Sequence, residues 1–349
     1  MNRNVRLRVL LLPTLLLCPL LAAVESPDEQ LTGSPRDRAI DRGLACLRQQ
    51  VGADGVVNAG PRTALTALAT LAHLANGITP SDAQHGAWLG RTIDYVLSRQ
   101  DENGYFGHLD GSRMYGHGIA TLLLAQATGE CGDDAREARV RAALVRAVAL
   151  TLRAQQVTKE PLHRGGWRYQ PNDTSSDLSL SGWQLLSLHA CRQIGMAIPE
   201  RAIADGSAYA RSLIGEQGQV GYERRGDDRP ALRGLALLVL ELGRPPLGPP
   251  AAEQALIANR ISEDPQGWQG GFFYYRAYYD ALGLARGAPT TWKAYGPRLE
   301  RLLLDHQAAD GSWLNPPGGD EGAYGSIYTT SMALLSLSVS RHLLPAHHF

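Results

Sequence analysis

Amphipathic segments recur along the chain, each with one apolar and one charged face. In residues 136–155 apolar side chains return at every fourth position and arginines fill the opposite side; the apolar positions are Val140, Leu144, Val148 and Leu152. This spacing is typical of a helix with one face in water. Five further segments share the pattern, which predicts an outer layer of six helices; they are 35–50, 84–99, 200–216, 251–260 and 291–306.

A second kind of segment alternates with the first and is apolar nearly all round. It is rich in alanine, glycine and serine, as in TALTALATLAHLA of residues 63–75. A helix without a polar face must be covered on all sides, so these segments predict an inner layer. The other five are 119–127, 178–194, 231–242, 274–285 and 328–344.

A short signature joins each outer segment to the inner one that follows. It is a Gln followed by a Gly-rich turn, clearest in Gln307-Ala-Ala-Asp-Gly-Ser-Trp313; the other copies begin at Gln50, Gln100, Gln156, Gln217 and Gln266. Six hairpins in strict alternation predict an all-α fold, an α/α toroid with six inner and six outer helices. The alternative is an open solenoid, but the absence of obvious capping repeats favours closure. The inner helices then begin at one end of the ring, which we call the mouth.

The signature also resembles a known superfamily. Gln307 to Trp313 and its weaker copies are similar to the repeats of terpenoid cyclases and protein prenyltransferases, over residues 35 to about 344. Four further stretches resemble the exported squalene-cyclase-like proteins, also called prenyltransferase/squalene oxidase repeat proteins; they are 114–119, 165–169, 179–184 and 324–335. The resemblance implies the toroid fold. For function it implies lipid cyclases, zinc prenyltransferases or toroids without catalytic residues.

The cyclase signature implied by this resemblance is incomplete. Such enzymes protonate an alkene with an Asp-x-Asp-Asp motif at the start of an inner helix. Here the matching stretch runs from Thr174 to Asp177, and Ser176 takes the place of the proton donor. Asp173 lies one position too early to restore the spacing. We therefore expect no alkene cyclisation, and the alternative role of Asp177 is to cap the helix that follows.

The zinc site of the prenyltransferases is also missing. It needs an Asp, a Cys two residues later and a distant His. Asp280 is followed by Leu282 instead, and the last inner helix begins near Tyr328 rather than a His. The one adjacent histidine pair is His347-His348 at the terminus. We predict neither a metal nor another cofactor.

Aromatic and ionisable side chains are expected to gather at the mouth. The candidate ligand-binding residues are Tyr115, His117, Trp167, Asp177, Arg229, Arg233, Tyr275, Tyr279, Tyr324 and Tyr328. Such side chains stack on a sugar ring or a lipid and hydrogen-bond its edges. In a polysaccharide lyase, a Tyr or His abstracts a proton while Arg stabilises the charge that forms. The catalytic candidates are His117, Asp177 and Tyr279. The alternative is that His117 is a hydrogen-bonded core histidine and that the tyrosines are packing residues.

One connection is longer than the others. Residues 157–176 join the third outer and inner segments with about twenty residues, and long loops in compact domains are often lids or binding elements. We expect residues 165–171, with Trp167, to form a rim over the mouth. Alternatively Trp167 fills the space between hairpins, as we expect of Trp313.

The beginning of the chain predicts export. Arg3, Arg6 and Arg8 precede an apolar run that ends near Ala22 and Ala23, the layout of a secretory signal peptide. We assign residues 1–25 to this signal, 26–34 to a linker, 35–345 to the toroid and 346–349 to a tail. The product is expected to be periplasmic or extracellular, with no stable membrane span in the mature chain.

Charge and cysteine content narrow the function further. Cleavage is expected between Ala23 and Ser26; if it falls before Glu25 it removes three of 34 basic residues and leaves 31 against 34 acidic ones, a net charge of −3. This balance gives no reason to expect nucleic acid as a partner. Three cysteines remain and allow at most one disulfide. We predict a non-catalytic domain that binds a glycan, an isoprenoid or a protein; the alternative is a lyase-like or cyclase-like enzyme acting in the mouth.

Overall fold

Helices alternate along the whole described part of the chain, as the periodicity predicted. The computed structural model describes residues 33–58, 60–244 and 252–341. The predicted signal peptide, most of the linker, the tail and the His347-His348 pair lie outside these residues. The outer helices are α1 (Pro35–Gln50), α3 (Gly86–Ser98), α5 (Asp134–Gln155), α7 (Glu200–Ser212), α9 (Ala252–Glu263) and α11 (Pro289–Leu304). The inner helices are α2 (Arg62–Leu74), α4 (Arg113–Ala127), α6 (Leu178–Gln193), α8 (Arg233–Leu242), α10 (Phe273–Gly287) and α12 (Gly325–Ser338).

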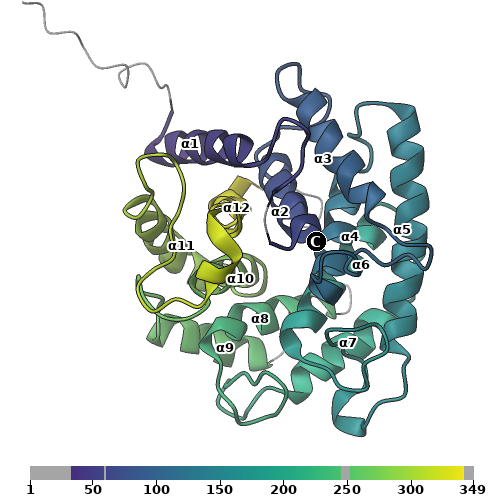
Figure 1. Ribbon diagram of the computed structural model, residues 1–349. Helices are drawn as coiled ribbons and strands as arrows, with labels where there is room; N and C mark the ends of the chain where they lie inside the picture. Colours follow the sequence, from purple (N-terminus) through teal and green to yellow (C-terminus); the bar gives the residue numbers. More distant parts are fainter. Residues whose placement is uncertain (1–32, 59, 245–251, 342–349) are drawn as a thin grey trace, which may run out of the picture. The chain divides into compact units, whose positions relative to one another are not determined.

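The inner helices form a closed ring. Each packs against the next inner helix, and α12 packs against α2, so the last hairpin meets the first. Figure 1 shows α12, in yellow, beside the purple α1 and α2. The predicted α/α toroid is therefore confirmed, and the open solenoid is excluded.

Burial follows the two patterns in the sequence. In α2 every residue from Thr63 to Leu74 is buried, and in α6 every residue from Leu178 to Cys191. Outer helices bury one face, which in α5 includes Val140, Leu144 and Val148. Apolar burial at this scale is the main stabilising term of such a fold.

Helix α4 begins at Arg113, six residues before the predicted start at Ile119, and its first turns contain Gly116 and Gly118. A Cβ on Gly118 would lie 2.7 Å from the Gln184 amide nitrogen on α6. A Cβ on Gly116 would lie 1.8 Å from the Ser112 hydroxyl. These glycines let α4 pack closely against its neighbours, so they belong to a buried helix rather than to a turn.

The repeated turn signature links each hairpin to the next through hydrogen bonds, and we call this link a staple. The Gln307 amide donates to the Gly311 carbonyl of its own turn at 2.9 Å and to the Ala39 carbonyl of α1 at 2.8 Å. Gln100 does the same with Gly104 and with Ala143 of α5. Each staple thus fixes a turn onto the next outer helix, and the Gln307 staple closes the ring.

The glycine of the signature makes this contact possible. Gly104 and Gly311 have φ angles of +92° and +85°, in the region that favours glycine. A Cβ on Gly311 would lie 2.4 Å from the Arg42 carbonyl oxygen, and one on Gly104 would lie 2.5 Å from that of Arg146. Only a glycine allows the turn to rest on the backbone of the next outer helix.

In the third hairpin the staple residue is Gln155, not Gln156 as the sequence suggested. The Gln155 amide donates to Gly165 and to Ala202 of α7, both at 2.8 Å. Gln155→Ala should lower the free energy of unfolding by about 1–3 kcal/mol, since two buried carbonyls lose their donor. Gln156→Ala is the matched control, because Gln156 is exposed and its change should cost under about 0.5 kcal/mol. Urea unfolding of both variants measures the difference, and equal losses would contradict the assignment.

Cys46, Cys131 and Cys191 are buried free thiols. Within the described ranges no helix is both long enough and apolar enough to cross a membrane.

Candidate functional site

Tyrosine side chains gather at the mouth, where the inner helices begin. Tyr115 comes from α4, Tyr275 from α10 and Tyr328 from α12. Tyr169 and Tyr222 come from the connections that precede α6 and α8. All but Tyr275 are half-buried, and Tyr275 keeps 8% of its surface exposed. Their rings therefore offer aromatic surface to a ligand at this end of the ring.

A chain of hydroxyls crosses the ring below this surface. The Tyr115 hydroxyl donates to Ser179 Oγ at 2.8 Å, and Ser179 Oγ lies 2.8 Å from the Tyr275 hydroxyl. Ser179 belongs to α6 and Tyr275 to α10, which are not neighbours in the ring. The hydrogen bond between them therefore spans the ring interior.

Aromatic rings fill the interior beneath the hydroxyl chain. Trp183 of α6 stacks on Tyr278 of α10 at 6.4 Å and meets Tyr279 edge-on at 5.7 Å. Tyr279 is fully buried, 4.7 Å from the Tyr275 ring. Packed side chains thus fill the ring interior beneath the mouth. Tyr279, a predicted site residue, is one of these buried side chains and does not reach the mouth surface.

Arg168 links the mouth tyrosines to two carboxylates. Its guanidinium lies 4.8 Å from the Tyr169 ring and 5.4 Å from the Tyr222 ring, and the hydroxyls of these two tyrosines are 2.8 Å apart. It also pairs with Asp177 at 3.2 Å and with Glu223. Cation–π contacts of this kind favour a guanidinium held between rings. We call Tyr115, Arg168, Tyr169, Tyr222 and Tyr328 the mouth cluster.

The loop that carries Arg168 and Tyr169 is held by hydrogen bonds along its length. The buried Lys159 ammonium caps the end of α5 by donating to the Ala154 carbonyl at 2.8 Å. Ser176 Oγ donates to the His163 carbonyl at 2.7 Å, and the Met114 amide donates to the Tyr169 carbonyl at 3.0 Å. Burial lowers the pKa of Lys159 to about 8. These bonds position Arg168 over the start of α6.

Asp177 sits at the start of α6 and is fully buried. Its Oδ1 accepts the Leu180 amide at 2.8 Å, which makes it the helix N-cap. Burial raises the pKa of Asp177 to about 6, against the opposing effects of the Leu180 amide and Arg168. The carboxylate thus caps α6 and pairs with Arg168, and it has no surface in contact with solvent.

Glu321 is a mouth carboxylate that the sequence did not reveal. It accepts the amides of Tyr274 and Tyr275 at 2.8 and 2.9 Å, and the Tyr328 hydroxyl at 3.0 Å. Burial raises the pKa of Glu321. It therefore caps α10 from a segment nearly fifty residues away. No local pattern signals this role, because capping motifs are recognised only within three or four residues.

Several predicted site residues face away from the mouth. His117 is buried between α4 and α5, with Nε2 2.9 Å from Thr151 Oγ1, and burial lowers its pKa to about 4. Trp167 is 1% exposed and donates its indole N–H to the Thr151 carbonyl at 2.8 Å, so it fills space between hairpins and forms no rim. Our expectation that both face the mouth was wrong, because their polar atoms find partners on α5.

The two arginines near α8 are also placed differently from the prediction. Arg233 is buried and pairs with Asp228 at 2.8 Å and with Asp264 at 2.9 Å, toward α9. Arg229 is exposed and pairs with Asp227 at 2.8 Å. Tyr324, by contrast, is 45% exposed with its ring 5.2 Å from Tyr328, beside the cluster. The structure thus brings Tyr115, Asp177, Tyr275, Tyr324 and Tyr328 to one end of the ring.

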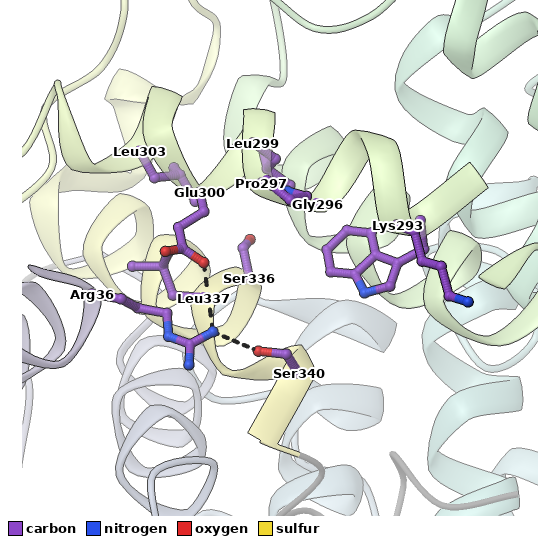
Figure 2. A pocket seen from close by; sticks show the side chains of 11 residues that line it. Arg36, Lys293, Gly296, Pro297, Leu299, Glu300, Leu303, Ser336, Leu337 and Ser340 are labelled. Carbon is purple, nitrogen blue, oxygen red and sulfur yellow. Dashed lines mark hydrogen bonds and ion pairs between the residues drawn. The ribbon is translucent and has the colours of Figure 1, made fainter. Parts of the chain in front are cut away.

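Two open cavities lie outside the mouth cluster. One, of about 450 Å³, is lined in part by Val157 and residues 170–172 of the 157–176 loop. The other, of about 270 Å³, lies between α1, α11 and the end of α12, far along α12 from the mouth. Figure 2 shows Arg36 there, between Glu300 and Ser340, with Lys293 on the other wall. Trp292 also lines this cavity. No group of three or more His, Cys, Asp or Glu in the described ranges is arranged to hold a metal ion.

Comparisons with known proteins support the fold. No protein-family model matches the chain, and no curated protein matches its sequence. Among solved structures it is similar to an inactive variant of the alpha-1,6-mannanase GH76A of Salegentibacter sp. HEL1_6 in complex with alpha-1,6-mannotetrose. The TM-score is 0.65 at 8% identity, over 89% of this chain and 100% of that chain.

Two further solved structures share the architecture at low identity. One is the type II terpene cyclase MstE from Scytonema, with a TM-score of 0.53 at 16% identity over 89% of this chain and 99% of that chain. The other is a glycosidase variant in complex with glucose, with a TM-score of 0.55 at 16% identity over 89% and 98%. Membership of the squalene-cyclase-like proteins stays a prediction. The chain has the α/α-toroid fold that glycosidases and terpene cyclases share.

Proposed function

We propose that this protein is an exported toroid whose mouth binds a glycan. The observation that carries the proposal is the mouth cluster, in which Arg168 lies against the rings of the half-buried Tyr169 and Tyr222. Sugar rings have an apolar face that stacks on aromatic rings and a hydroxyl edge that takes hydrogen bonds. The cluster supplies both kinds of contact in one place.

Binding without catalysis fits the state of the ionisable groups. Burial raises the pKa of Tyr115 and Tyr275 well above the ordinary value, so neither hydroxyl is a ready base near neutral pH. Glu321 is committed to helix amides and to Tyr328. Export remains part of the proposal and rests on the sequence of the first residues.

An enzyme acting at the same mouth is the second candidate. Asp177 has a pKa raised to about 6, and it shares Arg168 with Glu223. Two carboxyl groups held in different environments are the usual source of an acid and a base. Glycan cleavage at this site would require Asp177 to become accessible, which is why we prefer binding. Product analysis after incubation with the bound glycan distinguishes the two candidates.

A ligand panel tests the proposal directly. Two of the similar solved structures hold sugars, so the first probes are α-1,6-mannooligosaccharides and glucose oligomers. A ligand at about 100 times its dissociation constant should stabilise the protein by about 2.7 kcal/mol, a measurable rise in melting temperature. Isoprenoids serve as the comparison class. A melting temperature raised by isoprenoids and unchanged by every glycan would overturn the proposal.

The pH dependence of stability tests the burial of Asp177. Its folded-state pKa of about 6 exceeds the ordinary 3.8, so its contribution to stability is present below about pH 4 and is lost as the pH rises through about 6. Asp177→Asn keeps a good helix cap but does not titrate. The variant should therefore gain stability relative to the unmodified protein between about pH 4 and pH 8.

Urea unfolding across this pH range measures the difference between the two proteins. The neutral core histidines His73 and His117 are present in both, so their acid-side effects cancel. The quantity compared is the unfolding free energy of Asp177→Asn minus that of the unmodified protein. If it stays constant or falls as the pH rises, Asp177 ionises normally in the folded state.

A further inference from the structure

We propose that the 450 Å³ cavity beside the 157–176 loop is a second subsite, which takes the next sugar unit of a glycan bound at the mouth. This inference rests on the proposed function. The cavity lies between the turn that precedes α4, the end of α5 and residues 170–172 of the loop. Its volume falls within the range of about 300–1,000 Å³ typical of small-molecule sites.

The lining has the chemistry of a site for a neutral polyol. One wall is apolar, formed by Leu150, Ala154 and Val157 at the end of α5 and just beyond it. The other walls carry amide groups of Asn103, Gln170 and Asn172, with one carboxylate, one guanidinium and one imidazole, from Asp101, Arg153 and His108. The carboxylate and the guanidinium carry opposite charges, so the lining favours neither an anion nor a cation strongly. A sugar with one apolar face and several hydroxyls matches both walls.

Tyr105 gives a second and independent indication. It lines the cavity and is 6% exposed, and within the described residues its hydroxyl has no hydrogen-bond partner. A buried hydroxyl without a partner is unfavourable, and buried polar groups in proteins are nearly always paired. That hydroxyl has no accessible surface in the free protein, so a sugar hydroxyl supplies the partner once the lining side chains shift to open it.

The cavity and the mouth cluster share the 157–176 loop. Arg168 and Tyr169 belong to the mouth cluster, and the next three residues, 170–172, line the cavity. Consecutive Cα atoms are about 3.8 Å apart, so a short oligosaccharide that crosses this segment reaches both sites. A turn fixes the segment, in which the Gln170 amide donates to Asp173 Oδ2 at 2.8 Å.

The test compares a short and a long ligand on variants of the two sites. Calorimetry measures binding of α-1,6-mannobiose and α-1,6-mannotetraose to the whole protein. Asn172→Trp should fill the cavity, and Thr174→Trp is its control on an exposed position of the same loop that does not line it. Tyr105→Phe removes only the unpartnered hydroxyl. Both cavity variants should weaken the tetrasaccharide about tenfold and leave the disaccharide unchanged.

The outcomes separate this inference from the proposed function. If Asn172→Trp and Tyr105→Phe bind the tetrasaccharide like the unmodified protein, while Tyr169→Ala weakens both ligands, the mouth stands and the subsite is wrong. If the cavity variants weaken binding and Tyr169→Ala does not, the glycan binds at the cavity alone. In that case the mouth proposal fails. The subsite inference fails with it, because it defines the cavity as the site next to a glycan bound at the mouth. Absence of binding by the unmodified protein overturns both, and equal melting temperatures confirm that the variants are folded.

Discussion

Trp313→Ala should lower the free energy of unfolding by about 3–5 kcal/mol, the usual loss for a large buried aromatic side chain. Trp313 has no exposed surface, and its indole N–H donates to the Leu303 carbonyl of α11 at 2.8 Å. Its backbone amide donates to Thr330 Oγ1 of α12 at 3.1 Å, and its ring packs against Gly43 of α1. The side chain thus joins the last hairpin to the first, and its removal leaves a cavity at the closure of the ring.

Urea unfolding measures this loss, with Trp292→Ala as the matched control. Trp292 is half-buried and lines the 270 Å³ cavity, so its removal should lower the free energy of unfolding clearly less. If both variants lost the same free energy of unfolding, the contacts of Trp313 across the ring closure would add no stability. Glycan affinity of the Trp313 variant should be unchanged at temperatures where it is folded.

Tyr169→Ala should weaken glycan binding at least tenfold, about 1.4 kcal/mol, because it removes the most central ring of the mouth cluster. Tyr169 lies 6.2 Å from the Tyr115 ring and contacts two guanidinium groups, those of Arg113 and Arg168. Its backbone carbonyl, which holds Met114, is kept in the variant. Titration with α-1,6-mannotetraose checks the expected loss.

The control for this prediction lies at the other end of the ring. Trp292 is half-buried like Tyr169, but it lines the 270 Å³ cavity far from the mouth. Trp292→Ala should therefore leave the affinity for the glycan unchanged. If Trp292→Ala weakens binding and Tyr169→Ala does not, the glycan site is the groove of Figure 2 and the mouth proposal is wrong.

Tyr275 is a poorer test of binding than its position in the sequence suggested. The sequence places Tyr275 at the start of an inner helix as a candidate ligand-binding residue, yet it is 92% buried and its hydroxyl takes part in the chain across the ring. Tyr275→Ala would open a cavity, so a loss of binding could come from a loss of structure. Tyr275→Phe keeps the ring and isolates the hydroxyl, worth about 1 kcal/mol.

The sequence predicted the helices because their patterns lie within one hairpin, and it predicted closure because six hairpins alternate without obvious capping repeats. Segments with a polar face became outer helices, and segments without one became inner helices. The Gln and Gly of the turn were visible as a repeat, and Asp177 was recognised as a possible cap from its neighbours alone. These inferences need only the spacing of residues along a helix, which a sequence contains in full.

Which side of an inner helix faces the mouth was decided by the tertiary structure. His117 lies two residues from Tyr115, yet one turns to α5 and the other to Ser179 of α6. An inner helix is apolar on every side, so its pattern carries no information about rotation around its axis. The partners of Glu321 and the neighbours of Arg168 come from distant hairpins, and only the closed ring brings them together. The sequence by itself therefore determined the toroid, while the packing of the inner ring decided the site, because contacts between hairpins leave no periodic trace in the chain.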